Sequence, residues 1–190
     1  MKIQLTIVFL VLGILNVFSQ APGLVVQTGL TAAYSKDGNV TKANQGHYGW
    51  MVGADARILD GDLYFIVGGQ YHQTSLASTA SPSFFSKNDF KFLSGRAGIG
   101  FNVLRLSEKI SFRSKIVGSI NFIFDAPSDG LNIAGYKDVN DSSMGAVTGL
   151  GLTMGSIDID LDFQYGLINV FYKQPKTTFD SWTLMAGFHF

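Results

Sequence analysis

The residues best suited to chemistry are three aspartates at alternate positions of one segment, Asp158, Asp160 and Asp162. Alternate residues of an extended strand share one face, so the three carboxylates are expected to point the same way. Carboxylates that repel one another in an interior of low dielectric constant need cations nearby. Cations with the matching phase, and a fourth acidic residue, occur in three other alternating segments. These residues are Asp55, Arg57, Arg96, Arg113 and Lys115.

These eight charged residues have three interpretations. They can form a plug of salt bridges that fills an interior, hold a metal ion, or line a narrow path for ions. A metal site is disfavoured, because like-facing carboxylates of one strand lie about 7 Å apart. In addition, no inward His joins them from an adjacent strand, as a metal site would favour. We therefore predict a network of lumen charges that holds neither a metal nor another cofactor.

An acid–base or nucleophilic site would depend on His72. Thr74, Ser75 and Ser78 follow it, and Asp89 lies across the same connection. The residue types of a His–Ser–carboxylate site are therefore present, but their spacing is not specific. A His at the rim of a barrel usually just meets solvent. We expect no catalytic residue and no enzymatic activity, and lipid modification through His72 is the third-ranked function.

The elements that must position these residues are strands. Eight segments of about 10 or 11 residues alternate between apolar residues and polar or small ones, with the period of a β-strand. In the fifth segment, for example, Ile110 and Phe112 alternate with Ser111 and Arg113. The eight predicted strands span residues 24–34, 48–58, 63–72, 90–103, 110–124, 144–154, 157–167 and 182–190.

The connections between the predicted strands alternate strictly between short and long. Three are short, at residues 59–62, 104–109 and 155–156. Four are long, at residues 35–47, 73–89, 125–143 and 168–180. Short periplasmic turns and long external loops are typical of barrels in the outer membrane. The pattern predicts an all-β, eight-stranded antiparallel up-and-down barrel with both termini in the periplasm.

The distribution of polarity distinguishes two kinds of barrel. A soluble barrel that carries a greasy ligand is apolar inside and polar outside. Here the charged residues share one face, while the other is continuously apolar and carries aromatic residues near the strand ends, such as Tyr48, Trp50 and Tyr71. Aromatic residues at both rims are typical of membrane barrels. We therefore predict a transmembrane barrel whose narrow interior is filled by its own side chains.

Composition and the first residues agree with this placement. Charged residues make up only 15% of the chain, against about 25% in ordinary soluble domains. The formal net charge is zero, so no basic surface indicates nucleic acid as a partner. Residues 1–19 have the charged start, apolar run and small residues of a cleavable signal peptide. The predicted domains are thus a signal peptide (1–19) and a barrel (20–190).

The last predicted strand places Trp182, Leu184, Phe188 and Phe190 on one face, and an aromatic residue ends the chain. At this point the sequence resembles outer-membrane β-barrel proteins of Gram-negative bacteria, whose insertion signal is such a strand ending in Phe. The resemblance implies that these four residues are an assembly signal read by the barrel-assembly machinery.

Glycine-rich strands extend the resemblance, notably at residues 97–102 and 149–153, together with the Phe-Ser-Gln-Ala junction at residues 18–21 and the ending at residues 187–190. Over its predicted mature length the chain resembles small barrels of Bacteroidota, of the porin-family or PorT-like kind. It resembles OmpA and OmpX barrels more distantly.

The long connections carry aromatic residues at positions expected outside the membrane. These contact candidates are Phe84, Phe85, Phe171, Tyr172 and Phe179. They suit contact with lipopolysaccharide or with another outer-membrane protein, but they can equally pack on one another and cap the barrel. The expected function is a structural or interaction role, including that of an accessory subunit. A narrow porin-like channel for ions or small solutes is the second-ranked function.

Overall fold

The computed structural model describes residues 23–35, 47–58, 61–75, 89–107, 109–126, 138–172 and 174–190. The predicted signal peptide (1–19), Phe84 and Phe85 lie outside these described residues. The regular elements within them are eight strands. They are β1 (Leu24–Tyr34), β2 (His47–Ile58), β3 (Leu63–Ser75), β4 (Asp89–Ser107), β5 (Ile110–Asp125), β6 (Ser142–Met154), β7 (Ile157–Gly166) and β8 (Asp180–His189).

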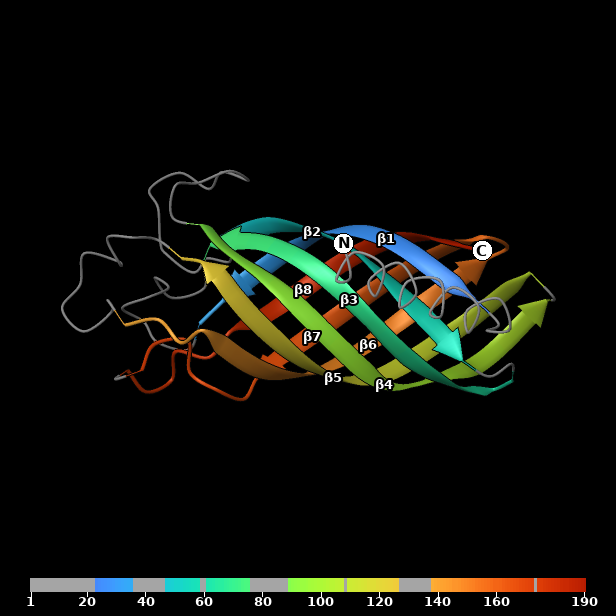
Figure 1. Ribbon diagram of the computed structural model, residues 1–190. Helices are drawn as coiled ribbons and strands as arrows, with labels where there is room; N and C mark the ends of the chain where they lie inside the picture. The colour runs from blue at the N-terminus through green and yellow to red at the C-terminus, as the bar shows by residue number, and fades with distance from the viewer. Residues whose placement is uncertain are drawn as a thin grey trace, which may run out of the picture.

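The strands close into one antiparallel barrel in which each strand pairs with its neighbours along the chain (Figure 1). Pairing of β1 with β8 closes the sheet, with Val26 opposite Phe188 and Leu30 opposite Leu184. Because the strand number is even, the first and last strands meet antiparallel and need no crossover. The predicted eight-stranded up-and-down topology is confirmed. Among the described residues, no helix is long and apolar enough to span a membrane.

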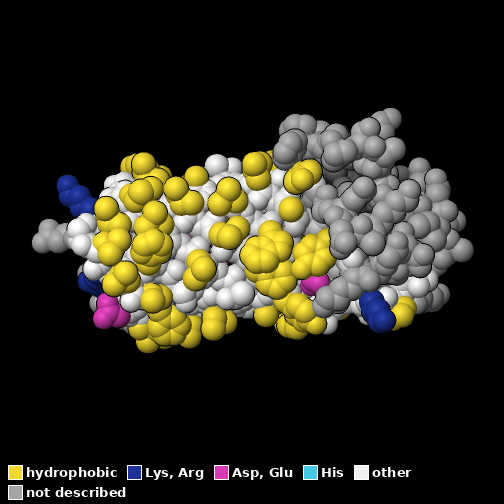
Figure 2. Space-filling view, turned by 180° about the vertical axis from the view of Figure 1, so that it is seen from behind, with side chains coloured by type: hydrophobic (Ala, Val, Ile, Leu, Met, Phe, Trp, Pro, Cys, Tyr) yellow, Lys and Arg dark blue, Asp and Glu magenta, His cyan; other side chains and the backbone are white. Residues whose placement is uncertain are grey.

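Alternation along the strands separates the two faces of the barrel wall. In β7, Asp158 and Asp160 are buried while Ile157 and Ile159 are exposed. Figure 2 shows the outcome on one face of the molecule, where apolar side chains spread over the wall and charged ones lie near its two ends. A surface this apolar is out of place in water, and it suits contact with hydrocarbon.

The two ends of the barrel differ. One end carries residues 23 and 190 together with the turns that follow β2, β4 and β6, and we call it the terminal end. The opposite end carries the connections that follow β1, β3, β5 and β7, and we call it the loop end (Figure 1). Short connections thus gather at the terminal end, as the sequence predicts.

The turn predicted at residues 104–109 is wrong in extent. β4 continues to Ser107, and its pairing with β5 slips at Val103 and again at Leu106, each of which stands unpaired between paired neighbours. Two bulges in one strand break the regular alternation that defined the predicted boundary. Because β3 pairs with β4 only as far as Phe101, the end of the β4–β5 hairpin projects beyond β3 (Figure 1).

Candidate functional site in the barrel lumen

The lumen near the terminal end holds a continuous chain of alternating cations and anions. Arg57 begins it, with its Nη2 atom 2.7 Å from Oδ2 of Asp158. Arg113 then bridges two aspartates, because its Nη2 atom lies 3.2 Å from Asp158 and 3.2 Å from Asp160. Lys115 continues the chain, with Nζ 3.4 Å from Asp160 and 2.9 Å from Asp162.

The chain of ion pairs returns to β2, the strand on which it begins. Nη2 of Arg96 lies 3.3 Å from Oδ2 of Asp162, and its Nε atom lies 3.6 Å from Oδ1 of Asp55. Gln27 completes it by donating from Nε2 to the other Asp55 oxygen at 2.8 Å. The structure therefore brings together all eight charges that the sequence singled out, four cations against four carboxylates.

All but one of the charged side chains of this network are buried, so each of them needs a partner of opposite charge. All four aspartates, Arg96, Arg113 and Lys115 are buried, and only Arg57 is partly accessible. Charges removed from water are stabilised only when partners of opposite sign compensate them. Each cation of the chain contacts at least one carboxylate, and Arg96, Arg113 and Lys115 each contact two. The network behaves chemically as a neutral, cross-linked plug.

Two glycines of β6 make room for the plug. A methyl group at Gly149 would clash with Asp162 and lie 2.7 Å from Cε of Lys115. A methyl group at Gly151 would clash with Asp160 and lie 2.9 Å from Nη2 of Arg113. The long cationic side chains of Arg113 and Lys115 on β5 reach the aspartates of β7 only because β6, which lies between them, has glycine at these positions.

Two polar residues of the network were missed by the sequence reasoning. Gln27 holds Asp55, and the hydroxyl of Thr153 donates to Oδ1 of Asp158 at 2.6 Å. Gln27 has the inward phase of its strand, which is the signal that could have found it. Thr153 precedes the tight turn at Gly155, which adopts a positive φ of 62°.

An apolar cluster, which we call the cap, lies in the lumen at the loop end. Its buried members are Ala33, Phe90, Phe92, Val170, Phe171 and Phe179. Phe171 packs edge-on against Phe90 with ring centroids 6.2 Å apart, and Phe179 packs against Phe92 at 5.2 Å. Of the two arrangements expected for the loop aromatics, Phe171 and Phe179 adopt the capping one, because the connection folds inward and buries both rings.

Hydrogen bonds fix the connection that supplies the cap. The N–H of Val170 donates to the carbonyl of Thr177 at 2.9 Å and so ties these two residues together. The N–H of Asn140 donates to Val170 at 2.8 Å, and that of Tyr172 donates to Asp138 at 3.0 Å. This backbone frame leaves Tyr172 pointing outward with 74% of its surface exposed. Tyr172 is the contact candidate that the structure presents to solvent among those it describes.

The surroundings of His72 differ from those of a site at the rim. Its ring is buried and stacks on Phe92, with centroids 4.8 Å and planes 7° apart. Nε2 lies 3.1 Å from Oε1 of Gln70. The expected contact with solvent is wrong because the cap covers this level of the lumen. Ser78 and the side chains of Ser75 and Asp89 lie outside the described residues.

No group of three or more His, Asp or Glu side chains within the described ranges is arranged to hold a metal ion. The four lumen aspartates are instead engaged by Arg, Lys, Gln and Thr. The chemistry of this donor set is therefore that of a structural ion-pair network.

Comparison with solved structures supports the same architecture. The chain shares the fold of Neisserial surface protein A. The match covers 88% of this chain and 94% of the chain of that protein, with a TM-score of 0.58 and 17% sequence identity. A second similar structure is Ail, the attachment invasion locus protein of Yersinia pestis, in complex with the heparin analogue sucrose octasulfate. This match covers 88% of this chain and 98% of the Ail chain, with a TM-score of 0.43 and 17% sequence identity. At 17% identity the likeness to Neisserial surface protein A concerns the fold alone. No protein-family model and no curated protein matches the sequence.

Proposed function

We propose that this protein is an integral outer-membrane barrel that acts through its loop end as a structural or interaction protein, and that its lumen does not conduct. One observation carries the proposal. Buried side chains occupy the lumen at two levels, the ion-pair plug toward the terminal end and the cap at the loop end, and we take these as two closures. A solute path would need both closures to open, whereas an interaction role needs neither.

The outer surface supports placement in a membrane. Exposed apolar residues face outward on all sides of the wall, among them Leu30, Ile116 and Leu150. Toward the loop end the outward residues become aromatic, with Trp50 packed on Tyr71 at 5.2 Å and Phe163 on Trp182 at 4.7 Å. An apolar band bordered by aromatic rings matches the hydrocarbon and interface layers of a bilayer. By this placement the terminal end is periplasmic.

The loop end supports an interaction role. The N–H of Tyr172 is hydrogen-bonded to the carbonyl of Asp138 and the preceding Phe171 is buried, so little conformational freedom is lost when a partner covers Tyr172. Exposed tyrosines held in this way are frequent anchors of interfaces. The partner is lipopolysaccharide or another outer-membrane protein, and insertion uses the barrel-assembly machinery. The finer likeness to porin-family barrels of Bacteroidota belongs to this proposal and rests on sequence pattern.

A planar-bilayer measurement separates this proposal from the channel alternative. The refolded protein, verified as folded by its heat-modifiable migration, is expected to give no reproducible conductance steps. Steps from the unaltered protein would overturn the proposal and favour a narrow channel. A variant that combines Phe171→Ala with Lys115→Ala and Asp162→Ala removes side chains from both the cap and the ion-pair plug. Its conductance shows what an opened lumen would give and serves as the comparison.

A pull-down tests the interaction role. The protein is tagged within residues 36–46 and extracted from its native outer membrane in mild detergent. Stoichiometric recovery of a second membrane protein or of lipopolysaccharide is expected, and Tyr172→Ala should reduce it. Lys91→Gln is the matched control. Lys91 is also partly exposed near the loop end, but it forms an ion pair with Asp125 and is not a predicted contact residue. Recovery that is the same for both variants would remove Tyr172 from the interface.

The lipid-modifying alternative gains no support from the described contacts of His72, which are Phe92 and Gln70. A catalytic His needs a nucleophile or a substrate within hydrogen-bond reach. Lipid A that changes on expression of this protein, and no longer changes with His72→Ala, would reverse this ranking.

A further inference from the structure

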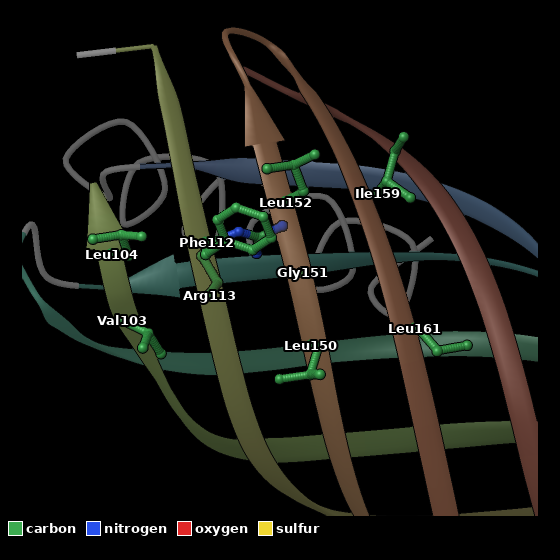
Figure 3. Close-up of a pocket in the computed structure, with 9 residues that line it drawn as sticks. All are labelled: Val103, Leu104, Phe112, Arg113, Leu150, Gly151, Leu152, Ile159 and Leu161. Atoms are coloured by element: carbon green, nitrogen blue, oxygen red, sulfur yellow. The ribbon is translucent and has the colours of Figure 1, made fainter. Parts of the chain in front are cut away.

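The outer wall of the barrel contains a hollow near the terminal end, where β4, β5, β6 and β7 lie side by side (Figure 3). Its volume is about 440 Å³, which lies within the range of about 300–1,000 Å³ that is common for small-molecule sites. The residues that line it are Val103, Leu104, Phe112, Arg113, Leu150, Gly151, Leu152, Ile159 and Leu161.

Strand register explains the shape of the hollow. Leu104, Phe112, Leu152 and Ile159 form one row across the four strands, because each is the register partner of the next. Leu150 and Leu161 form part of a second row nearer the loop end. Arg113 and Gly151 lie between the rows at lumen-facing positions, so they contribute a low floor rather than outward side chains.

The bulge in β4 builds one side of the hollow. Val103 stands between the pairs Asn102–Arg113 and Leu104–Phe112 without a partner of its own. Both Val103 and Leu104 therefore face outward, with 67% and 51% of their surfaces exposed. A β-bulge commonly re-aims side chains in this way. Figure 3 shows both side chains on β4, separated from Leu150 and Leu161 by the breadth of β5.

The chemistry of the lining selects the occupant. Apart from the floor at Arg113 and Gly151, every side chain of the hollow is aliphatic or aromatic, so it offers nothing to a polar ligand. In the membrane placement proposed above, the hollow faces hydrocarbon near the periplasmic interface. A flexible acyl chain fills such a surface without leaving polar groups unpaired.

Charges beyond the hollow match a headgroup. Arg105 follows Leu104 directly, and its Nη2 atom lies 3.3 Å from Oδ1 of Asp62, with both side chains largely exposed. Lys109 is exposed in the turn of the same hairpin. Glu108 lies outside the described residues. An adjacent cation and anion complement a headgroup that carries both a phosphate and an ammonium group, and an exposed ion pair such as Arg105–Asp62 is weak enough to rearrange around it.

We propose that this hollow and hairpin bind one zwitterionic phospholipid of the periplasmic leaflet, with an acyl chain against Leu150 and Phe112 and the headgroup beside Arg105, Lys109 and Asp62. The site is on the outside of the barrel, distinct from the lumen network and from the loop end. It rests on the membrane placement of the proposed function, but not on the interaction role of Tyr172.

The test is native mass spectrometry of the full mature chain. The protein is refolded into vesicles that contain equal amounts of phosphatidylethanolamine and phosphatidylglycerol, and then released in mild detergent. We expect one retained phosphatidylethanolamine per barrel. Leu150→Trp fills the hollow and should abolish this adduct. Leu30→Trp, an equally apolar and exposed position on β1, should retain it.

The headgroup contact has its own pair of variants. Lys109→Gln should reduce the adduct, while Lys91→Gln near the opposite end should not. Heat-modifiable migration confirms that each variant is folded, so a folded barrel without the adduct overturns the lipid site and leaves the proposed membrane placement intact. Failure of the unaltered protein to insert into vesicles would count against that placement instead. Equal retention of the two lipids, or equal retention by Leu150→Trp and Leu30→Trp, also overturns the lipid site.

Discussion

The guanidinium of Arg57 and the carboxylate of Asp158 meet at 2.7 Å although 101 positions separate them in the chain. Asp158 also contacts Arg113 at 3.2 Å and accepts the Thr153 hydroxyl at 2.6 Å, and it is completely buried. One carboxylate therefore compensates two cations from two strands, which makes Asp158 the most connected anion of the plug at the terminal end.

Asp158→Ala should destabilise the folded barrel strongly. Removing one partner from a buried ion pair leaves uncompensated charge, which costs about 3–5 kcal/mol. Urea unfolding of the refolded protein, followed by the mobility difference between folded and unfolded forms, measures this loss. Asp125→Ala is the control, because Asp125 forms an exposed pair with Lys91 and such pairs contribute about 0–1 kcal/mol. Equal midpoints for the two variants would mean that water screens the lumen charges, which would favour the channel alternative.

Phe171→Ala should weaken the loop end, whereas the neighbouring Tyr172→Ala should not. Phe171 is 1% exposed within the cap, and truncation of a buried Phe costs about 3–5 kcal/mol. Tyr172 is 74% exposed, so its truncation is expected to change stability by less than about 0.5 kcal/mol. Hydrogen exchange of the amides at residues 167–179 measures the local effect. Matching exchange rates in the two variants would show that the cap does not hold this connection.

The strand pattern was predictable because alternation is a local property. Asp158, Asp160 and Asp162 had to share a face with one another, and the phase of Arg113 and Lys115 placed them on the matching face. Which cation meets which carboxylate depends on register between strands. Gly149 and Gly151 allow the observed register, but a glycine in a sequence does not reveal which side chain will pass over it.

What the pattern left open and what it misplaced have a common physical cause, the absence of periodicity. Phe171 and Phe179 lie in a connection, where no alternation shows whether a ring points inward or outward. In β4, the bulge at Val103 places two consecutive apolar residues, Val103 and Leu104, on the exposed surface, so the alternation stops before the strand does. His72 had the inward phase, but its burial depends on the cap that covers it.

Gly98→Ala should destabilise the barrel, and Gly118→Ala should not. A methyl group at Gly98 would clash with the backbone of Ile116 and lie 2.6 Å from Cα of Val117, and a backbone cannot move aside as a flexible side chain can. Overpacking of this kind costs about 1–3 kcal/mol. At Gly118 the heavy atom nearest to such a methyl group is the carbonyl oxygen of Ala97, 3.8 Å away. Urea midpoints of the two variants should therefore differ, and a Gly98→Ala barrel as stable as Gly118→Ala would contradict the close approach of β4 and β5.

Deletion of Phe190 should impair assembly in cells without much loss of stability in the folded barrel. The N–H of Phe190 donates to the carbonyl of Leu24 at 2.9 Å, but its ring is largely exposed and contacts Phe188 at the surface, with centroids 4.9 Å apart. A ring that adds so little burial contributes little to the folded state, so its expected role is recognition during insertion.

Heat-modifiable migration of protein from cells should show less folded barrel for the deletion, while refolding of the same variant into vesicles should approach that of the unaltered chain. Phe190→Trp keeps an aromatic end and is the control. A normal amount of folded deletion variant in cells would contradict the assembly role, and equal losses in cells and in vesicles would assign Phe190 to stability instead.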